Sequence, residues 1–545
     1  MTNLNVSILQ INPTIGDIKG NYNKILTGID NADKNDSDIL LTPELSLIGY
    51  PPMDILRRDK MYEIQNEKLN AIKKYTNNKN LAVVIGYCRR DDDGLYNSAI
   101  VFKNGEKLTN YDKVLLPTYD VFDGHRYFET GDEINVFELN NQKIALTICE
   151  DAWYNVNIMD TKRHKFNPFD KIKDYDTDLI LNLSASPYRI NKNNERIELF
   201  KKHAVNTSST IAFCNQVGGN DELVFDGNSF VVNKDGVIEQ LNAFETDIRT
   251  INIDKGANET QLNTPRRIEE MNSAICLGLQ DYFEKTGFSK AIVGMSGGID
   301  STIATVLSVQ ALGKDNVLGV SLPSKVTSTE SITDAKSVAE NLGIDFEVID
   351  ISSIITQVIN DFESESPYKM KGLALENIQA RIRGDILMSL SNTTNALVIT
   401  PDNKSEAAIG YCTLYGDTVG AIAPLGDCYK KHVYELAEYH NEGENIIPQN
   451  VIEKEPTAEL KENQVDSDEM AEYEILDTIL NEYVENRKKP DEITVDSKEE
   501  IDNIISKIHM SEFKRNQSPL PIRVTKKDFG RGWRYPIAAD YEFLK

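Results

Sequence analysis

The residues Gly294-Met-Ser-Gly-Gly-Ile-Asp-Ser-Thr302 decide the fold of the second half of this 545-residue chain. An apolar run at 291–295 precedes them, and 301–312 carries apolar residues at helical spacing. Paired glycines let the backbone approach a ligand closely, and the free N–H groups at the start of a helix attract anions. The stretch therefore predicts a strand, a phosphate-binding loop and a helix.

The chemistry of this loop points to a nucleotide held together with a metal ion. It lacks the Gly-Lys-Ser/Thr ending of a Walker A loop, and it contains Asp300. A carboxylate repels phosphate unless a cation lies between them, so we expect bound Mg²⁺. On either side, apolar runs at 291–295, 317–322 and 345–349 alternate with helical patterns, which predicts an α/β domain with a parallel sheet.

The first half of the chain also reads as α/β. Short apolar runs predict strands at 6–10, 39–42, 81–86, 99–102, 143–148, 179–183 and 210–215, and longer amphipathic stretches predict helices at 61–75 and 195–207. A polar stretch with Gly and Pro at 254–267 indicates a connection, which gives domains at 1–253 and 268–545. The acidic stretch 453–500 is expected to form helices on a solvated surface.

Charge and cysteine usage exclude several classes of protein. With 59 Lys and Arg against 86 Asp and Glu, the net charge is −27, which argues against nucleic-acid binding. The six cysteines form no C-x-x-C pair, so we expect neither disulfides nor a zinc site, and we expect a reducing, cytoplasmic location. The sequence contains no run of 18 apolar residues, so we expect no membrane span. Its first residues do not resemble a signal peptide.

The phosphate loop resembles that of the N-type ATP pyrophosphatases, which use ATP to adenylate a substrate. Four later segments, 376–383, 400–406, 410–417 and 454–460, follow it in an order that resembles the NAD synthetases. That resemblance covers 268 to the C-terminus and implies a Rossmann-like parallel-sheet domain that amidates deamido-NAD, with ATP as co-substrate. One departure is Thr400-Pro-Asp-Asn-Lys-Ser-Glu406, where the family usually reads Thr-Gly-Asn-Lys-Ser-Glu.

The same resemblance implies three sets of binding residues. Asp300 and Glu406 are implied to hold Mg²⁺. The residues implied to contact deamido-NAD are Asn377, Glu406 and Lys514. The residues implied to bind ATP are Gly294, Met295, Ser296, Gly297, Gly298, Ile299, Asp300, Ser301 and Thr400.

Three chemically suited residues stand in separate segments of the first half. Glu44 follows a predicted strand in Leu41-Thr-Pro-Glu-Leu, Lys113 lies in Tyr111-Asp-Lys-Val, and Cys149 ends a predicted strand in Ile148-Cys-Glu-Asp. A thiol at a strand end can attack a substrate, a glutamate can take its proton, and a lysine can stabilise an oxyanion. Taken singly, a cysteine after a strand is usually a small core residue, and Glu or Lys near a loop is usually surface charge.

The ordered set with its flanking residues is similar to the nitrilase superfamily of carbon–nitrogen hydrolases. This resemblance covers about 2–250 and implies a four-layer α-β-β-α sandwich with a Glu–Lys–Cys catalytic triad. Beside a synthetase it implies glutamine as the amide, bound by Tyr119, Ser186 and Lys192. Where many members carry a further glutamate, this chain has Phe122-Asp-Gly-His125.

Together the two halves resemble the glutamine-dependent NAD synthetase family. Hydrolysis of glutamine would supply ammonia, and the second half would use ATP and ammonia to convert deamido-NAD to NAD with release of AMP and pyrophosphate. We expect small-molecule substrates only, and a homo-oligomer through the synthetase domain. Two alternatives remain open: a glutaminase that feeds another ATP-pyrophosphatase amidation, and an inactive nucleotide-binding regulatory homologue.

Overall fold

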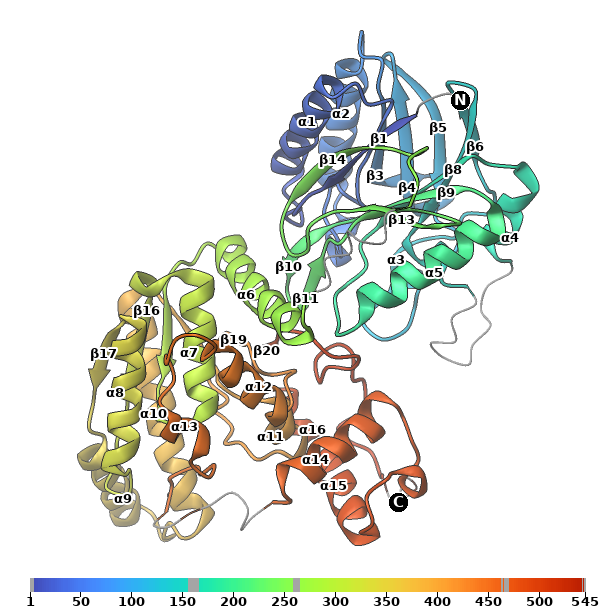
Figure 1. The fold of residues 1–545 in the computed structure, drawn as a ribbon. Helices are drawn as coiled ribbons and strands as arrows, with labels where there is room; N and C mark the ends of the chain where they lie inside the picture. The colour runs from blue at the N-terminus through green and yellow to red at the C-terminus, as the bar shows by residue number, and fades with distance from the viewer. Residues whose placement is uncertain are drawn as a thin grey trace. The chain divides into compact units, whose positions relative to one another are not determined.

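The computed structural model describes residues 4–154, 166–257, 265–461, 464, 470–541 and 543. The chain divides into two compact units, Met1–Pro265 and Arg266–Lys545 (Figure 1). Of the predicted connection 254–267, residues 258–264 lie outside the described residues.

The first unit contains two six-stranded sheets. The first has the order β14-β1-β2-β3-β4-β5 and the second β13-β12-β9-β8-β7-β6. The strands of the first sheet are β1 (Asn5–Gln10), β2 (Ile39–Leu41), β3 (Ala82–Asp91), β4 (Gly94–Lys103), β5 (Glu106–Asp112) and β14 (Asp247–Asn252). Those of the second are β6 (Val136–Leu139), β7 (Gln142–Ile148), β8 (Leu179–Ser184), β9 (Thr210–Asn215), β12 (Phe230–Asn233) and β13 (Gly236–Gln240). A separate hairpin joins β10 (Val217–Asn220) to β11 (Leu223–Asp226).

Helices cover the outer face of each sheet, as Figure 1 shows. On β3, Val83 and Ile85 pack in one cluster with α1 (Ile18–Lys34) and α2 (Asp59–Tyr75). Ala82 and Val84 point the other way, into the cluster between the two sheets. That second cluster also contains residues of α4 (Pro168–Ile172) and α5 (Lys192–Thr207). Burial on both faces explains why these strands read as continuous apolar runs, and the four-layer α-β-β-α sandwich is confirmed.

The second unit is built on a wholly parallel sheet with the order β17-β16-β15-β18-β19-β20. Its strands are β15 (Ala291–Gly294), β16 (Val317–Ser321), β17 (Asp345–Val348), β18 (Leu397–Ile399), β19 (Ile422–Ala423) and β20 (Leu520–Pro521). From β15 the chain adds β16 and β17 on one side and then returns to add β18 on the other. This reversal creates a switch point, where open α/β sheets bind ligands beyond the carboxyl ends of the strands.

Helices surround this sheet and form a second cluster beside it. The longer helices are α6 (Arg267–Thr286), α7 (Ile299–Leu312), α8 (Thr329–Leu342), α9 (Ser352–Glu365), α10 (Leu373–Thr394) and α12 (Lys430–His440). The others are α11 (Lys404–Ile409), α13 (Gln449–Glu453), α14 (Tyr473–Leu480), α15 (Lys498–Met510) and α16 (Glu512–Arg515). No helix within the described ranges is long and apolar enough to cross a membrane.

Every strand and helix predicted above is present, with ends shifted by a few residues at most. The expectation of a solvated surface for 453–500 is wrong. Leu476, Ile479 and Leu480 of α14 are buried in a cluster with Ile504 of α15, because these short helices place their apolar residues on one shared face.

Candidate active sites

Cys149 lies where β7 ends, as the first residue of the 3-10 turn η2 (Cys149–Ala152). Its φ of 42° is in the left-handed region, which a residue with a side chain adopts only when its surroundings enforce it. The thiol is buried. A strained residue at the end of a buried strand is a geometry suited to presenting a nucleophile.

Three donors hold the Glu44 carboxylate beside this cysteine. Oε1 accepts from Lys113 Nζ at 2.6 Å and from Asn97 Nδ2 at 2.7 Å, and Oε2 accepts from the Ala185 backbone N–H at 3.0 Å. Glu44 and Lys113 are both buried, and the same N–H of Ala185 interacts with the Cys149 sulfur. The structure thus brings together the three predicted catalytic residues from three separate segments.

Asp151 connects the two segments that carry the cysteine and the lysine. Its carboxylate accepts from the backbone N–H groups of Ile148 at 2.8 Å, Val114 at 3.1 Å and Leu115 at 2.8 Å, and from Tyr111 Oη at 2.7 Å. Burial raises the pKa of Asp151 to about 6, against the effect of these donors. The turn after β7 is therefore fixed to the segment that follows β5.

The electrostatics of the site keep the thiol protonated in the absence of substrate. Burial and the Glu44 carboxylate together raise the pKa of Cys149 to about 12, although the Lys113 ammonium opposes the rise. Burial would lower the pKa of Lys113, but Glu44 and Cys149 outweigh it, so the lysine stays charged. A protonated thiol beside an anchored carboxylate is an arrangement in which the carboxylate can accept the thiol proton.

Glu150 stands between two of the residues predicted to bind glutamine. Tyr119 Oη donates to both of its carboxylate oxygens, at 3.0 and 3.1 Å. Burial raises the pKa of Glu150 to about 7 and lowers that of Lys192 to about 7, and each group also feels the charge of the other. The Lys192 ammonium lies 3.5 Å from the centre of the Trp153 ring.

Ser186, the third predicted glutamine residue, is held by a buried arginine. Its Oγ accepts from Arg196 Nε at 3.1 Å, and its carbonyl accepts from Arg196 Nη2 at 2.7 Å. Arg196 is itself fixed by two 2.8 Å bonds to Asp226, in an ion pair with no exposed side-chain surface. These contacts hold the loop at Ser186 in place.

In the second unit, a cavity of about 280 Å³ opens at the carboxyl ends of β15, β16 and β18. Most of the predicted phosphate loop lines it, namely Gly294, Met295, Ser296, Gly298, Ile299, Asp300 and Ser301. Gly297 has φ 83°, and a Cβ there would clash with the backbone of Ser331, so only glycine fits. The loop leads directly into the N-terminus of α7, where the positive end of the helix dipole favours an anion.

Asp300 and Glu406, the predicted Mg²⁺ residues, share one lysine. Lys430 Nζ lies 2.6 Å from Asp300 Oδ2 and 2.9 Å from Glu406 Oε1, and Asn403 Nδ2 donates to Asp300 Oδ1 at 2.9 Å. Burial raises the pKa of Asp300 against the pull of Lys430. Burial acts in the same sense on Glu406, but Lys430 and hydrogen bonds such as that from Tyr473 outweigh it and lower the pKa of Glu406.

These side chains fit Mg²⁺ bound jointly with a nucleotide. Among the described residues no group of three or more His, Cys, Asp or Glu side chains could hold a metal alone. Mg²⁺ usually takes one or two carboxylates together with substrate phosphates, and Asp300 and Glu406 both line the cavity next to the phosphate loop. Asp402 and Asp417 line the same cavity, where burial and the neighbouring carboxylates raise the pKa of Asp402.

Besides Gly297, three predicted binding residues do not line this cavity. Thr400 is buried and donates from Oγ1 to the Val419 carbonyl at 2.9 Å. Asn377 Oδ1 accepts from Thr413 Oγ1 at 2.8 Å, and Lys514 Nζ donates to the carbonyls of Gly410 and Cys412. Asn377 and Lys514 thus hold the two ends of the 410–413 loop, whose Tyr411 reaches the cavity.

Several site residues escaped the sequence reasoning. Asn97 and Lys430 carry no signal of their own, because only the fold brings them to the predicted residues. Glu150 adjoins Cys149 and was visible as part of Ile148-Cys-Glu-Asp. Within 453–500, the segment 454–460 is singled out in the sequence and lines the cavity, but the contact of Tyr473 with Glu406 is not expected from a solvated surface.

Comparisons with known proteins agree with this division of the chain. Residues 5–261 match the carbon-nitrogen hydrolase family and residues 271–518 match the NAD synthase family. The glutamine-dependent NAD(+) synthetase of Synechocystis sp. is 40% identical over 551 residues, covering 98% of each chain. That of Aquifex aeolicus is 39% identical, covering 98% of this chain and 99% of the relative. A solved glutamine-dependent NAD+ synthetase from Acinetobacter baumannii, in complex with adenosine diphosphate, is 33% identical with a TM-score of 0.77 over 98% of each chain.

Proposed function

Because the chain belongs to the glutamine-dependent NAD(+) synthetase family of ATP-dependent ligases, we propose that its two units perform the two halves of that reaction with the residues described above. The first unit hydrolyses glutamine, and the second amidates deamido-NAD at the expense of ATP. The observation that carries the proposal is the buried 2.6 Å contact between Lys113 and Glu44 beside Cys149. A lysine–glutamate pair that served only the stability of the fold would not require a cysteine with a left-handed backbone beside it.

In the first unit Cys149 attacks the side-chain amide carbon of glutamine. Glu44 takes the thiol proton as the C–S bond forms and passes it to the leaving nitrogen, which departs as ammonia. Lys113 donates a hydrogen bond to the oxyanion that forms at the amide oxygen. Glu44 then removes a proton from water, which cleaves the thioester and releases glutamate.

Tyr119, Glu150, Ser186 and Lys192 are the groups that select glutamine. An amino acid presents one cation and one anion at its α-carbon. We assign the α-ammonium to Glu150, which Tyr119 orients, and the α-carboxylate to Lys192 and the Ser186 hydroxyl, whose oxygen accepts from Arg196. Each of these side chains is buried or partly buried. A buried charged group needs a partner in place of water, and the two charges of glutamine supply such partners.

In the second unit the cavity at the switch point takes ATP, with phosphates at residues 295–298 and the N-terminus of α7. The carboxylate of deamido-NAD attacks the α-phosphorus, and the bond to pyrophosphate breaks. Ammonia then attacks the adenylated carbonyl carbon, AMP leaves and the amide is formed. Lys430 and the helix N-terminus stabilise negative charge on the leaving group.

Asp300 and Glu406 would hold Mg²⁺, which neutralises charge on the phosphates when it is bound. Thr400 is assigned to the ATP side of this site, where it supports the chain beneath Pro401 and Asp402. Asn377 and Lys514 are assigned to deamido-NAD through the 410–413 loop that they hold.

We also propose a cytoplasmic location and a homo-oligomer assembled through the second unit. The first is supported by six cysteines that are all free, as expected in a reducing compartment. Light scattering coupled to size-exclusion chromatography measures the second directly, and a monomer at micromolar concentration would exclude it.

One experiment tests the function as a whole. Purified protein is incubated with deamido-NAD, ATP and Mg²⁺, with either glutamine or ammonium as the nitrogen donor, and NAD and AMP are quantified. We expect equal amounts of NAD and AMP with both donors. Formation of neither product, with either donor, would contradict the proposal.

A further inference from the structure

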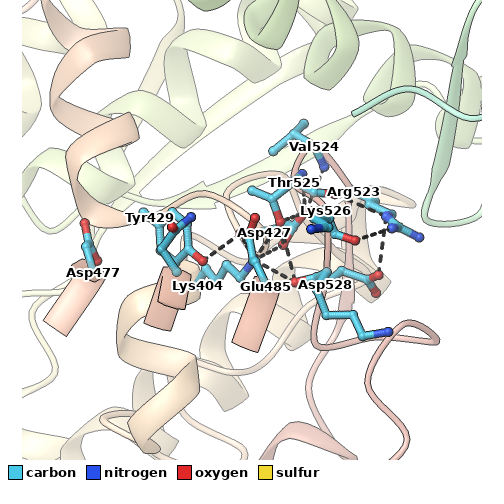
Figure 2. A network of polar contacts seen from close by, with 12 residues as sticks. Lys404, Asp427, Tyr429, Asp477, Glu485, Arg523, Val524, Thr525, Lys526 and Asp528 are labelled. Atoms are coloured by element: carbon cyan, nitrogen blue, oxygen red, sulfur yellow. Dashed lines mark hydrogen bonds and ion pairs between the residues drawn. The ribbon is translucent and has the colours of Figure 1, made fainter. Parts of the chain in front are cut away.

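A buried lysine lies behind the amidation site and is not used by the reaction above. Lys404 is the first residue of α11 and has no exposed side-chain surface. Its Nζ donates to Thr525 Oγ1 at 2.6 Å, to the Lys527 carbonyl at 2.7 Å and to Glu485 Oε1 at 2.9 Å, and it pairs with Asp427 Oδ1 at 2.9 Å (Figure 2). Every proton of the ammonium therefore has a partner from a distant part of the chain.

The network buries Lys404 together with two carboxylates, those of Asp427 and Glu485. The Glu485 pKa falls to about 2 because Lys404 and hydrogen bonds overcome burial. Burying charges in this way is a weak route to stability, since well-packed apolar residues of similar volume often do as well. The contacts that Lys404 and its neighbours make indicate another role for this residue.

The partners of Lys404 are themselves anchored. Asp427 Oδ2 accepts from the backbone N–H groups of Val524 at 2.9 Å and Thr525 at 2.7 Å, which fixes the segment that follows β20 (Figure 2). Glu485 ends a π-helical turn, η7 (Asn481–Glu485), and accepts from Tyr429 Oη at 2.6 Å. Such turns are rare and are frequently found at functional sites.

The residues on either side of Lys404 contact Asp300, Glu406 and Lys430, the charged groups at the cavity of the second unit. Asn403 binds Asp300 and, through Oδ1, accepts from the Glu406 backbone N–H at 3.0 Å. Ser405 donates to Asp477 and accepts from the Lys430 backbone N–H at 2.9 Å. In one turn of helix, two neighbours thus contact Asp300, Glu406 and Lys430, while Lys404 between them joins the buried network.

We propose that Lys404 is a positioning residue for amidation, an inference that rests on the proposed function of the second unit. It fastens the first turn of α11 to η7 and to the segment 523–527, and so fixes Asn403 and Glu406 at the cavity. The motif Asn403-Lys-Ser-Glu406 then acts as a unit: Lys404 anchors the first turn of α11, and its neighbours position the groups that contact the ligands. Residues at 485 and 525, remote in sequence, become part of the support of the site.

The test uses the full chain and three single variants that keep all the charges. Thr525→Val removes one donor–acceptor contact of Lys404, and Tyr429→Phe removes the hydroxyl that holds Glu485. Tyr483→Phe is the matched control, because Tyr483 lies on the same π-helical turn but its hydroxyl pairs with His509 at 2.7 Å, outside the network. For each variant we measure kcat and KM for ATP with ammonium as the nitrogen donor, the rate of glutamine hydrolysis, and Tm.

We expect Thr525→Val and Tyr429→Phe each to lower kcat roughly tenfold, because small misplacements of reacting groups cost up to about 10²-fold. The KM for ATP and glutamine hydrolysis should change less than about twofold. Tyr483→Phe should lose a similar amount of Tm and keep its kcat. If kcat of both network variants matches that of Tyr483→Phe, Lys404 serves stability alone and the inference is overturned.

Lys404→Met removes the anchor itself and should abolish NAD formation from either donor while glutamine hydrolysis continues. Should this variant fail to fold, the charge-preserving variants decide the question. Wild-type protein is assayed beside them. A wild type that makes no NAD would contradict the proposed function, whereas a loss confined to the variants bears on Lys404 alone.

Discussion

Lys113→Met is the perturbation whose size follows most directly from the structure. The lysine and Glu44 are buried and 2.6 Å apart, so the methionine leaves a buried carboxylate without its cation. Breaking a buried pair costs about 3–5 kcal/mol. Asn97 and the Ala185 N–H still bind Glu44, which places the expected loss near the lower end, about 3 kcal/mol. At roughly 2–4 °C per kcal/mol for a unit of this size, the Tm of the first unit should fall by about 6–12 °C.

The catalytic loss in this variant should be larger than the loss of stability suggests. Removing one donor to an oxyanion lowers kcat by about 10²–10³. Glutamate release from glutamine is measured at a temperature well below both melting transitions, beside the control Lys107→Met, an exposed lysine on β5. Ammonium-dependent NAD formation should be unchanged in both variants. Glutamine hydrolysis within about threefold of wild type in a folded Lys113→Met protein would refute the assigned role.

Three further predictions concern pH and the ATP reaction. Lys192 must be protonated to bind glutamine, and this state is lost as pH rises through about 7, whereas Glu150 must be ionised, a state lost as pH falls through about 7. The value of kcat/KM for glutamine should therefore decline on both sides of about pH 7. A flat profile from pH 5 to 9 would contradict the assignment. Asp300→Asn and Glu406→Gln should each abolish NAD formation from either donor with no change in glutamine hydrolysis, and a variant that makes NAD at the wild-type rate disproves its metal role. ATP should yield AMP and pyrophosphate, because the 296–301 loop lacks the lysine of a Walker A site, and ADP as the stoichiometric product in a chromatographic assay rules out adenylation.

The sequence was most informative where local chemistry and local structure coincide. The loop 294–302 could be assigned because glycines, hydroxyls and a carboxylate stand between a strand and a helix, and the structure shows them lining one cavity. Glu44 and Cys149 could be nominated because they follow or end an apolar strand, and Lys113 because the ordered set of three resembles that of the nitrilase superfamily. Their meeting depends on parallel pairing of β7 with β8 and on packing of one sheet against the other, which no local pattern encodes.

What sequence reasoning missed are residues whose role comes from tertiary position. Lys430 reads as an ordinary residue at a helix start, yet it bridges Asp300 and Glu406. The stretch 453–500 was misjudged because its acidic composition is typical of a solvated surface. In the fold a few of its polar residues are turned inward: Tyr473 donates to Glu406, and Glu485 accepts from Tyr429. Composition reports charge but not the direction in which a side chain points.

The central claim is that one chain holds two separable chemistries, and Cys149→Ala tests it most directly. The substitution removes the nucleophile from the first unit and leaves the cavity of the second unit unaltered. NAD formed from deamido-NAD and ATP is measured with glutamine, and again with ammonium at a pH high enough to supply free ammonia, with wild type alongside. The account predicts no NAD with glutamine and the wild-type rate with ammonium. Normal glutamine-dependent synthesis by the variant would contradict it.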